Sequence, residues 1–109
     1  MDLQLASFKD LNRINEIERY TNENPWSFKN FESSLNAGNS SIVLKIENEI
    51  IGYAFFSVAA TDAHLLNITV SKDYHRNGYG KKILEQVVFQ SKVLGATVIF
   101  LEVRVSNVN

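Results

Sequence analysis

Two glycines, an arginine and a lysine lie within six residues at the end of the segment SKDYHRNGYG, residues 71–80, and the Lys81 that follows it. Gly78 and Gly80 have no Cβ atom, so a phosphate oxygen can approach their backbone closely. Arg76 and Lys81 can supply positive charge to a diphosphate. A helix that begins here would add unpaired N–H groups and the positive end of its dipole. The segment is therefore a candidate anion-binding loop.

The same residues also have a purely structural interpretation, in which two glycines and a basic residue form a turn and begin a helix. Two more specific phosphate-binding patterns do not fit. The Walker pattern needs Gly-Lys-Ser/Thr after four residues, and no such segment is present. The dinucleotide fingerprint needs a third glycine near position 83, which is Ile83.

Glu102 is a second residue that could do chemistry. It lies in the apolar segment TVIFLEVRV, residues 97–105, and could accept a proton as a general base. Alternatively, it is an outward-facing carboxylate that pairs with Arg104, two residues along the same strand face. His64 and His75 are isolated and the chain has no cysteine, so we expect no metal site. We expect His64 at the surface and His75 facing solvent in the loop.

The elements that must position these residues follow from the spacing of apolar residues. Residues 3–7 alternate briefly and predict an edge strand. Ser7 and Asp10 predict a capped helix, and Ser27 predicts the cap of a second helix that Gly38 closes. The apolar stripe of the first helix would comprise Phe8, Leu11, Ile14 and Ile17.

The second half of the chain changes to a strand-like pattern. Residues 41–47 and 50–60 are rich in β-branched and aromatic types and flank Asn48-Glu49, a predicted hairpin turn. Residues 63–71 predict a third strand of this kind, 81–96 a helix, and 97–105 a last strand. The order β-α-α-β-β-β-α-β predicts an α/β sandwich around one mixed sheet.

Composition limits the class of protein. The 109 residues are enough for one domain with a single core, and 45% are hydrophobic, which excludes a disordered chain. The net charge of −1, without a basic face, argues against direct nucleic-acid binding. Neither a membrane span nor a secretory signal is present in the sequence, so we expect no membrane association and a cytoplasmic protein.

Three segments resemble one enzyme family. Residues 67–84, NITVSKDYHRNGYGKKIL, resemble motif A of the GCN5-related N-acetyltransferase (GNAT) superfamily, a strand, a Gln/Arg-x-x-Gly-x-Gly/Ala loop and a helix. The match departs at His75, where the family favours Gln or Arg. Residues 23–35, ENPWSFKNFESSL, and 100–107, FLEVRVSN, resemble segments of its RimI-type ribosomal-protein-alanine N-acetyltransferases.

This resemblance implies a reaction: transfer of the acetyl group of acetyl-CoA to the N-terminal α-amine of a protein, with the N-terminal alanine of a ribosomal protein as the expected acceptor. Glu102 would be the catalytic base, and Asn107 would contact the cofactor. Trp26 would line the acceptor groove or simply pack against its neighbours. Backbone groups of Ile68, Thr69 and Val70 would bind the pantetheine arm. The pyrophosphate would be held by Arg76, Asn77, Gly78, Tyr79, Gly80 and Lys81, with Tyr79 also plugging the helix start.

Members of the GNAT family continue past the segment SN with a helix that carries a tyrosine, thought to reprotonate the coenzyme A thiolate. The chain's tyrosines are Tyr20, Tyr53, Tyr74 and Tyr79, and none matches that position. We therefore expect residues 1–109 to be one GNAT domain that is incomplete at its C-terminus, and the resemblance implies that its mixed sheet is mostly antiparallel and flanked by helices. The strand at 97–105 would then be an exposed apolar edge, suited to pairing with a second copy in a homodimer.

Two other functions fit the same residues. One is a GNAT enzyme that acetylates a small-molecule amine, since residues 24–37 would shape the acceptor groove and favour a peptide only weakly. The other is a catalytically silent acyl-CoA-binding module.

Overall fold

A five-stranded sheet forms the centre of the computed structural model, which describes residues 1–101. The strands lie in chain order, and each is antiparallel to its neighbour except β4 and β5, which are parallel. The order of elements is the predicted one. The strands are β1 (Asp2–Leu5), β2 (Ser40–Ile46), β3 (Glu49–Ala59), β4 (Asp62–Val70) and β5 (Val98–Phe100); the helices are α1 (Leu11–Thr21), α2 (Phe28–Asn36) and α3 (Tyr79–Val93), with short 3₁₀ turns at Phe8–Asp10 and Lys72–Tyr74.

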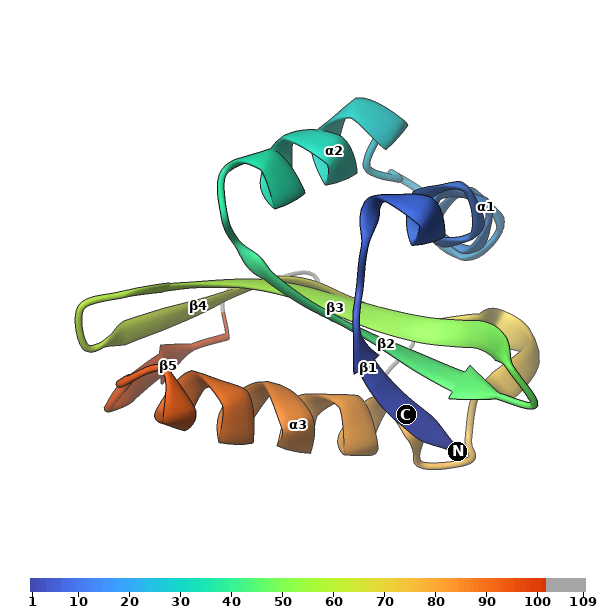
Figure 1. Ribbon diagram of the computed structural model, residues 1–109. Coiled ribbons are helices and arrows are strands. Elements are labelled where there is room, and N and C mark those ends of the chain that lie inside the picture. Colours follow the sequence, from blue (N-terminus) through green and yellow to red (C-terminus); the bar gives the residue numbers. More distant parts are fainter. Residues whose placement is uncertain (102–109) are drawn as a thin grey trace.

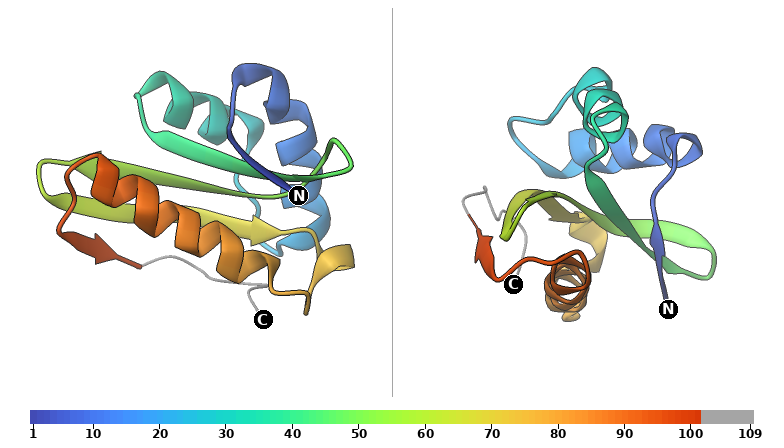
Figure 2. Two further views of the ribbon diagram at one scale, coloured as in Figure 1. Left: turned by 60° about the horizontal axis from the view of Figure 1, so that its bottom comes forward. Right: turned by 60° about the vertical axis from the view of Figure 1, so that its left-hand side comes forward.

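Helices cover both faces of the sheet, with α1 and α2 on one face and α3 on the other (Figure 1). Figure 2 shows from two further directions that α3 runs lengthwise along its face. Successive strand residues point to opposite faces, so β3 contributes Tyr53 and Phe55 to the core under α1 and α2. It contributes Ala54 and Phe56 to the core under α3. Both faces are buried, which explains the nearly continuous apolar sequence of β3.

The predicted helix ends are mostly correct. The Ser7 N–H donates to Asp10 Oδ2 at 2.9 Å, and Ser27 Oγ accepts from the Asn30 N–H at 3.1 Å. Gly38 follows α2 with φ +84°, the left-handed conformation typical of a helix end. Phe8 departs from the predicted stripe, because it lies in the 3₁₀ turn before α1 and is 53% exposed.

The turn between β2 and β3 lies one residue earlier than predicted. Ile46 pairs with Glu49, so the two loop residues are Glu47 and Asn48. Their φ angles are +50° and +68°, as a two-residue hairpin turn with two left-handed residues requires. Glu49 is instead the first residue of β3.

The last predicted strand is shorter in the described part of the chain. Val98, Ile99 and Phe100 pair in parallel with Asp62, Ala63 and His64. The rest of the predicted strand, residues 102–105, lies outside the described residues. The assignment of residues 1–109 to one domain, and pairing of two copies through this strand, stay predictions.

Candidate functional site

One edge of β4 is left open in the described part of the chain. β5 pairs only with Asp62–His64, and no strand within residues 1–101 pairs with that edge from Leu65 to Val70. The ladder to β3 has an irregularity here: Phe55 pairs with Asn67 and Phe56 with Leu65, which leaves Leu66 as an extra residue. An open strand edge can bind an extended ligand through its backbone groups.

The side chains at the end of β4 are not available to such a ligand. Ile68 and Val70 are both 1% exposed and pack in the core under α3. Thr69 is equally buried, and its hydroxyl lies within hydrogen-bonding distance of Glu18 of α1. These three predicted cofactor-binding residues can therefore contribute backbone atoms only.

The loop after β4 has the backbone geometry of an anion site. Arg76 and Gly78 both adopt left-handed conformations, with φ +67° and +76°. Gly78 is the residue before α3, and the first intrahelical hydrogen bond runs from the Lys82 N–H to its carbonyl at 3.2 Å. The N–H groups of Tyr79, Gly80 and Lys81, which come before Lys82 in the first turn of α3, have no partner within the helix. Unpaired N–H groups in the first turn of a helix, together with the positive end of the helix dipole, form a ready anion-binding site.

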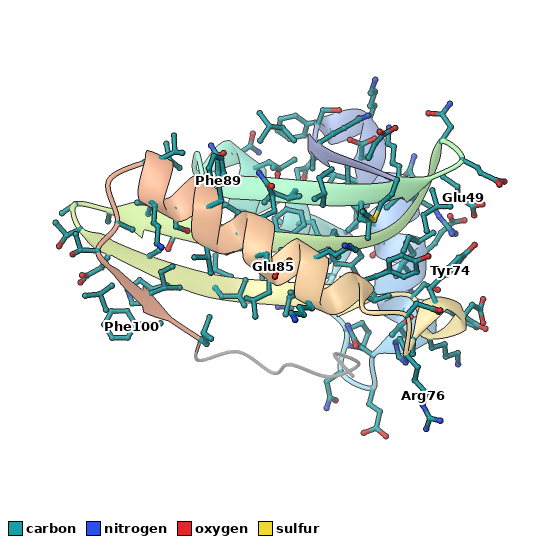
Figure 3. All side chains as sticks on the ribbon, turned by 90° about the horizontal axis from the view of Figure 1, so that it is seen from below. Glu49, Tyr74, Arg76, Glu85, Phe89 and Phe100 are labelled. Atoms are coloured by element: carbon teal, nitrogen blue, oxygen red, sulfur yellow. The ribbon has the colours of Figure 1, made fainter. Side chains whose placement is uncertain are left out.

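The side chains of this loop divide into two groups. Arg76 and Lys81 are exposed, and Figure 3 shows Arg76 pointing away from the sheet. Asn77 Nδ2 instead donates to the carbonyls of Tyr74 and His75, at 3.2 and 3.1 Å, so its amide stabilises the loop itself. Tyr79 is half-buried against the core under α3, as a plug would be. Gly80 is buried and Gly78 is exposed.

His75 does not face solvent, so that prediction is wrong. The residue is half-buried, and its Nε2 lies 2.8 Å from the carbonyl oxygen of Val70. A carbonyl can only accept, so the ring nitrogen must donate. His75 thereby ties the loop to the end of β4. His64 is exposed, as predicted.

The C-terminal end of α1 holds the 3₁₀ turn in front of the loop. Tyr20 Oη donates to Asp73 Oδ1 at 2.9 Å, and this hydrogen bond raises the pKa of Tyr20. The Lys72 Nζ lies 4.1 Å from the centroid of the Tyr20 ring, and the Lys72 N–H donates to Thr21 Oγ1 at 3.3 Å. The turn is therefore fixed to α1 as well as to β4.

Glu18 is a buried carboxylate that the sequence reasoning missed. Its oxygens accept from Tyr53 Oη at 2.6 Å, from the Trp26 N–H at 3.0 Å and from Asn67 Nδ2 at 3.3 Å. Burial and the neighbouring Glu18 carboxylate raise the pKa of Tyr53, so its hydroxyl stays protonated and donates. The available signal was its spacing, because Glu18 follows Ile14 by four residues and so lies on the buried face of α1.

The family follows from comparison with known proteins. The family model described as the acetyltransferase (GNAT) family matches residues 5–109. The chain belongs to this family. The predicted resemblance and the predicted fold class are confirmed, since solved GNAT structures share the fold.

Three relatives make the similarity specific. The [ribosomal protein bS18]-alanine N-acetyltransferase of Haemophilus influenzae is 37% identical over 100 residues, covering 90% of this chain and 67% of that protein. The enzyme of the same name from Salmonella typhimurium is 30% identical over 105 residues, covering 96% of this chain and 71% of that protein. The crystal structure of the ribosomal-protein-S18-alanine N-acetyltransferase from Escherichia coli matches at 30% identity with a TM-score of 0.89, over 97% of this chain and 68% of that one. This GNAT chain thus spans about two thirds of their length.

Other predicted GNAT site residues are only partly placed. Trp26 is half-buried, and its ring centroid lies 5.1 Å from that of Phe31 and 6.0 Å from that of Phe55, so it packs against both. A role in the acceptor groove stays a prediction. Glu102 and Asn107 lie outside the described residues, and their roles also stay predictions.

GNAT enzymes in general use acetyl-CoA as acetyl donor. Within residues 1–101, no group of three or more His, Asp or Glu side chains could hold a metal ion. No helix in that same range is long and apolar enough to span a membrane.

Proposed function

We propose that this chain acetylates the N-terminal α-amine of a protein with acetyl-CoA, and that the acceptor is the N-terminal alanine of a ribosomal protein. One observation carries the proposal: the edge of β4 that no strand within residues 1–101 covers leads into the loop at the N-terminus of α3, in which Arg76 and Gly78 are left-handed. The proposal is supported by relatives that are 30–37% identical and named for this reaction. The chain spans about two thirds of the length of these relatives, so the activity that their names give is proposed for this chain.

Acetyl-CoA supplies the activated acetyl group as a thioester, and the described residues fit its pyrophosphate and its pantetheine arm. We assign its pyrophosphate to the N–H groups of Tyr79, Gly80 and Lys81, with Arg76 and Lys81 as countercharges. Asn77 and Gly78 hold the loop in the required shape. The pantetheine arm would pair with the backbone of Ile68, Thr69 and Val70, whose side chains are buried in either case.

An α-amine is a favourable acceptor because its pKa is low for an amine. With a pKa near 8 about a tenth is neutral at pH 7, against less than about a thousandth of a lysine amine with a pKa near 10.4. A modest base therefore suffices, and we assign this role to Glu102, directly or through a water. Asn107 would contact the cofactor, and Trp26 would form part of the acceptor groove.

The proposal is tested by binding first and turnover second. Calorimetric titration with acetyl-CoA should show binding, and a peptide beginning with alanine should then be acetylated. Both peptides contain an internal lysine. The matched control has its N-terminus already acetylated, so that only the lysine amine remains, and it should not react. Glu102→Gln should lower the rate by about a hundredfold or more while acetyl-CoA still binds.

Each alternative has its own outcome. Absence of acetyl-CoA binding would refute the proposal. Binding without turnover would favour the silent acyl-CoA-binding module, and acetylation of a polyamine but not of the peptide would favour a small-molecule enzyme. A homodimer through the 97–105 strand and a cytoplasmic location stay predictions.

A further inference from the structure

The carboxylate of Glu18 is surrounded by hydrogen-bond donors. It is 1% exposed, and Tyr53, Trp26 and Asn67 all donate to it. A carboxylate in the interior is costly unless its oxygens are satisfied. Both side-chain oxygens of residue 18 must therefore accept hydrogen bonds. A glutamine has one oxygen and one NH₂ group, so it can accept at only one of the two positions.

Glu18 also sets the direction of a chain of side-chain hydrogen bonds on β4. The Asn67 amide nitrogen lies 3.3 and 3.4 Å from the two Glu18 oxygens, which leaves Asn67 Oδ1 to accept from Thr69 Oγ1 at 2.9 Å. Thr69 Oγ1 in turn accepts from Asn22 Nδ2 at 3.1 Å. Reversing the Asn67 amide would place its oxygen against the carboxylate of Glu18. Glu18 therefore fixes the orientation of the Asn67 amide and, through it, the directions of the hydrogen bonds at Thr69.

The two arms of this network end on the same segment. Asn22 is the residue after α1, and Trp26 lies just before Ser27, the N-cap of α2. Glu18 thus holds both ends of the connection between the two helices, one directly through the Trp26 N–H and the other through Asn67 and Thr69. These hydrogen bonds join the connection to β4, in addition to the packing of the Trp26 ring on Phe31 and Phe55.

We propose that Glu18 is a positioning residue for the acceptor, which holds the connection 22–27 at a fixed place beside the open edge of β4. This inference rests on the proposed function, in which that connection forms one wall of the acceptor groove and β4 carries the cofactor. The helix itself does not need Glu18 for its placement, because Leu11, Ile14 and Ile17 pack in the core under α1 and α2. Loss of Glu18 should therefore release the connection and leave α1 in place.

The decisive variant is Glu18→Gln, compared with Tyr53→Phe. Both lose hydrogen bonds in the network and should be less stable, but Tyr53→Phe leaves the arms to Trp26 and Asn22 intact. Glu16→Gln is the neutral control, since Glu16 lies on the same helix and its side chain is 70% exposed. If Glu18 served stability alone, the first two variants would affect acceptor binding in proportion to their loss of stability.

Trp26 is the chain's single tryptophan, so intrinsic fluorescence reports on the connection itself. In Glu18→Gln we expect red-shifted emission, stronger quenching by acrylamide and an unchanged Kd for acetyl-CoA. The Kd or KM for the alanine peptide should rise about tenfold, the size of a lost hydrogen bond to a charged group. Tyr53→Phe and Glu16→Gln should leave the fluorescence and the peptide affinity near those of the parent.

Three results would overturn the inference: unchanged Trp26 fluorescence in Glu18→Gln, equal weakening of acetyl-CoA and peptide binding, or an equal peptide effect in Tyr53→Phe. If Glu18→Gln does not fold, Thr69→Val takes its place, because it removes only the hydroxyl that links Asn67 to Asn22. It should change Trp26 quenching and peptide affinity in the same direction, and no change would again refute the inference. A parent chain that binds no acetyl-CoA would refute the proposed function instead, while the fluorescence comparison would still test the positioning.

Discussion

Replacing Gly78 by alanine tests the backbone geometry on which the anion site depends. Gly78 has φ +76° and ψ +11°, and a Cβ placed there would meet no atom within 4 Å. The substitution therefore introduces no clash, and its cost is that of an L-residue in the left-handed region, about 1–2 kcal/mol. We expect the free energy of unfolding in urea to fall by up to this amount with an unchanged m value.

The same cost must appear either in stability or in acetyl-CoA affinity. If the new alanine keeps the left-handed conformation, the N–H groups of the first turn of α3 stay in place and affinity is unchanged. If the loop relaxes, stability is spared but the ligand must restore the loop, which weakens binding by roughly tenfold for each 1.4 kcal/mol. The losses in unfolding and binding free energy should therefore sum to about 1–2 kcal/mol.

Gly78→Asn is the matched control, because asparagine tolerates the left-handed region better than alanine does. It should recover part of the loss in the same two measurements. The reasoning fails if Gly78→Ala changes neither stability nor affinity, or if Gly78→Asn is as costly as Gly78→Ala.

Three further substitutions, with Phe89→Ser as a surface control, test the packing and capping around the site by chemical denaturation. Gly52→Ala would place its Cβ 3.0 Å from the backbone oxygen of Thr69, which cannot move freely, and should cost about 1–3 kcal/mol; no loss would mean that β3 and β4 separate easily. Ser27→Ala removes the cap of α2 and should cost about 1 kcal/mol, and an unchanged midpoint would contradict that assignment. Phe31→Ala removes a fully buried ring and should cost about 3–5 kcal/mol. Phe89→Ser, on the exposed face of α3 (Figure 3), should change stability by less than about 0.5 kcal/mol. Equal effects of Phe31→Ala and Phe89→Ser would refute the assigned burial of Phe31.

The order of elements could be predicted because each element carries its own local signal. The apolar residues of α1 are spaced three or four apart, whereas β3 is almost continuously apolar, and Ser27 and Gly38 mark the ends of α2. The predicted hairpin turn, Asn48-Glu49, lies one residue too late, because Asn48 suits both that turn and the observed turn Glu47-Asn48. Only pairing of Ile46 with Glu49 decides the register.

The candidate site was predictable where it is local and hidden where it is not. Loop residues 76–81 are contiguous, so their glycines and cations were visible in the sequence. The partners of Glu18 are 35 residues away at Tyr53 and 49 at Asn67, and no local spacing reveals such contacts. His75 was misjudged for a related reason, since its partner is a backbone oxygen that has no sequence signature.

β4 shows why an apolar strand can conceal a binding role. Ile68 and Val70 fill the core under α3, while Asn67 and Thr69 are engaged in the Glu18 network on the opposite face. The side chains of the strand are thus committed to the two layers that cover the sheet. What remains for a ligand is the backbone edge, whose exposure depends on where β5 stops pairing. In the proposed roles, β4 then serves the cofactor through its backbone, whereas Glu18 serves the acceptor by holding the connection 22–27 beside this edge.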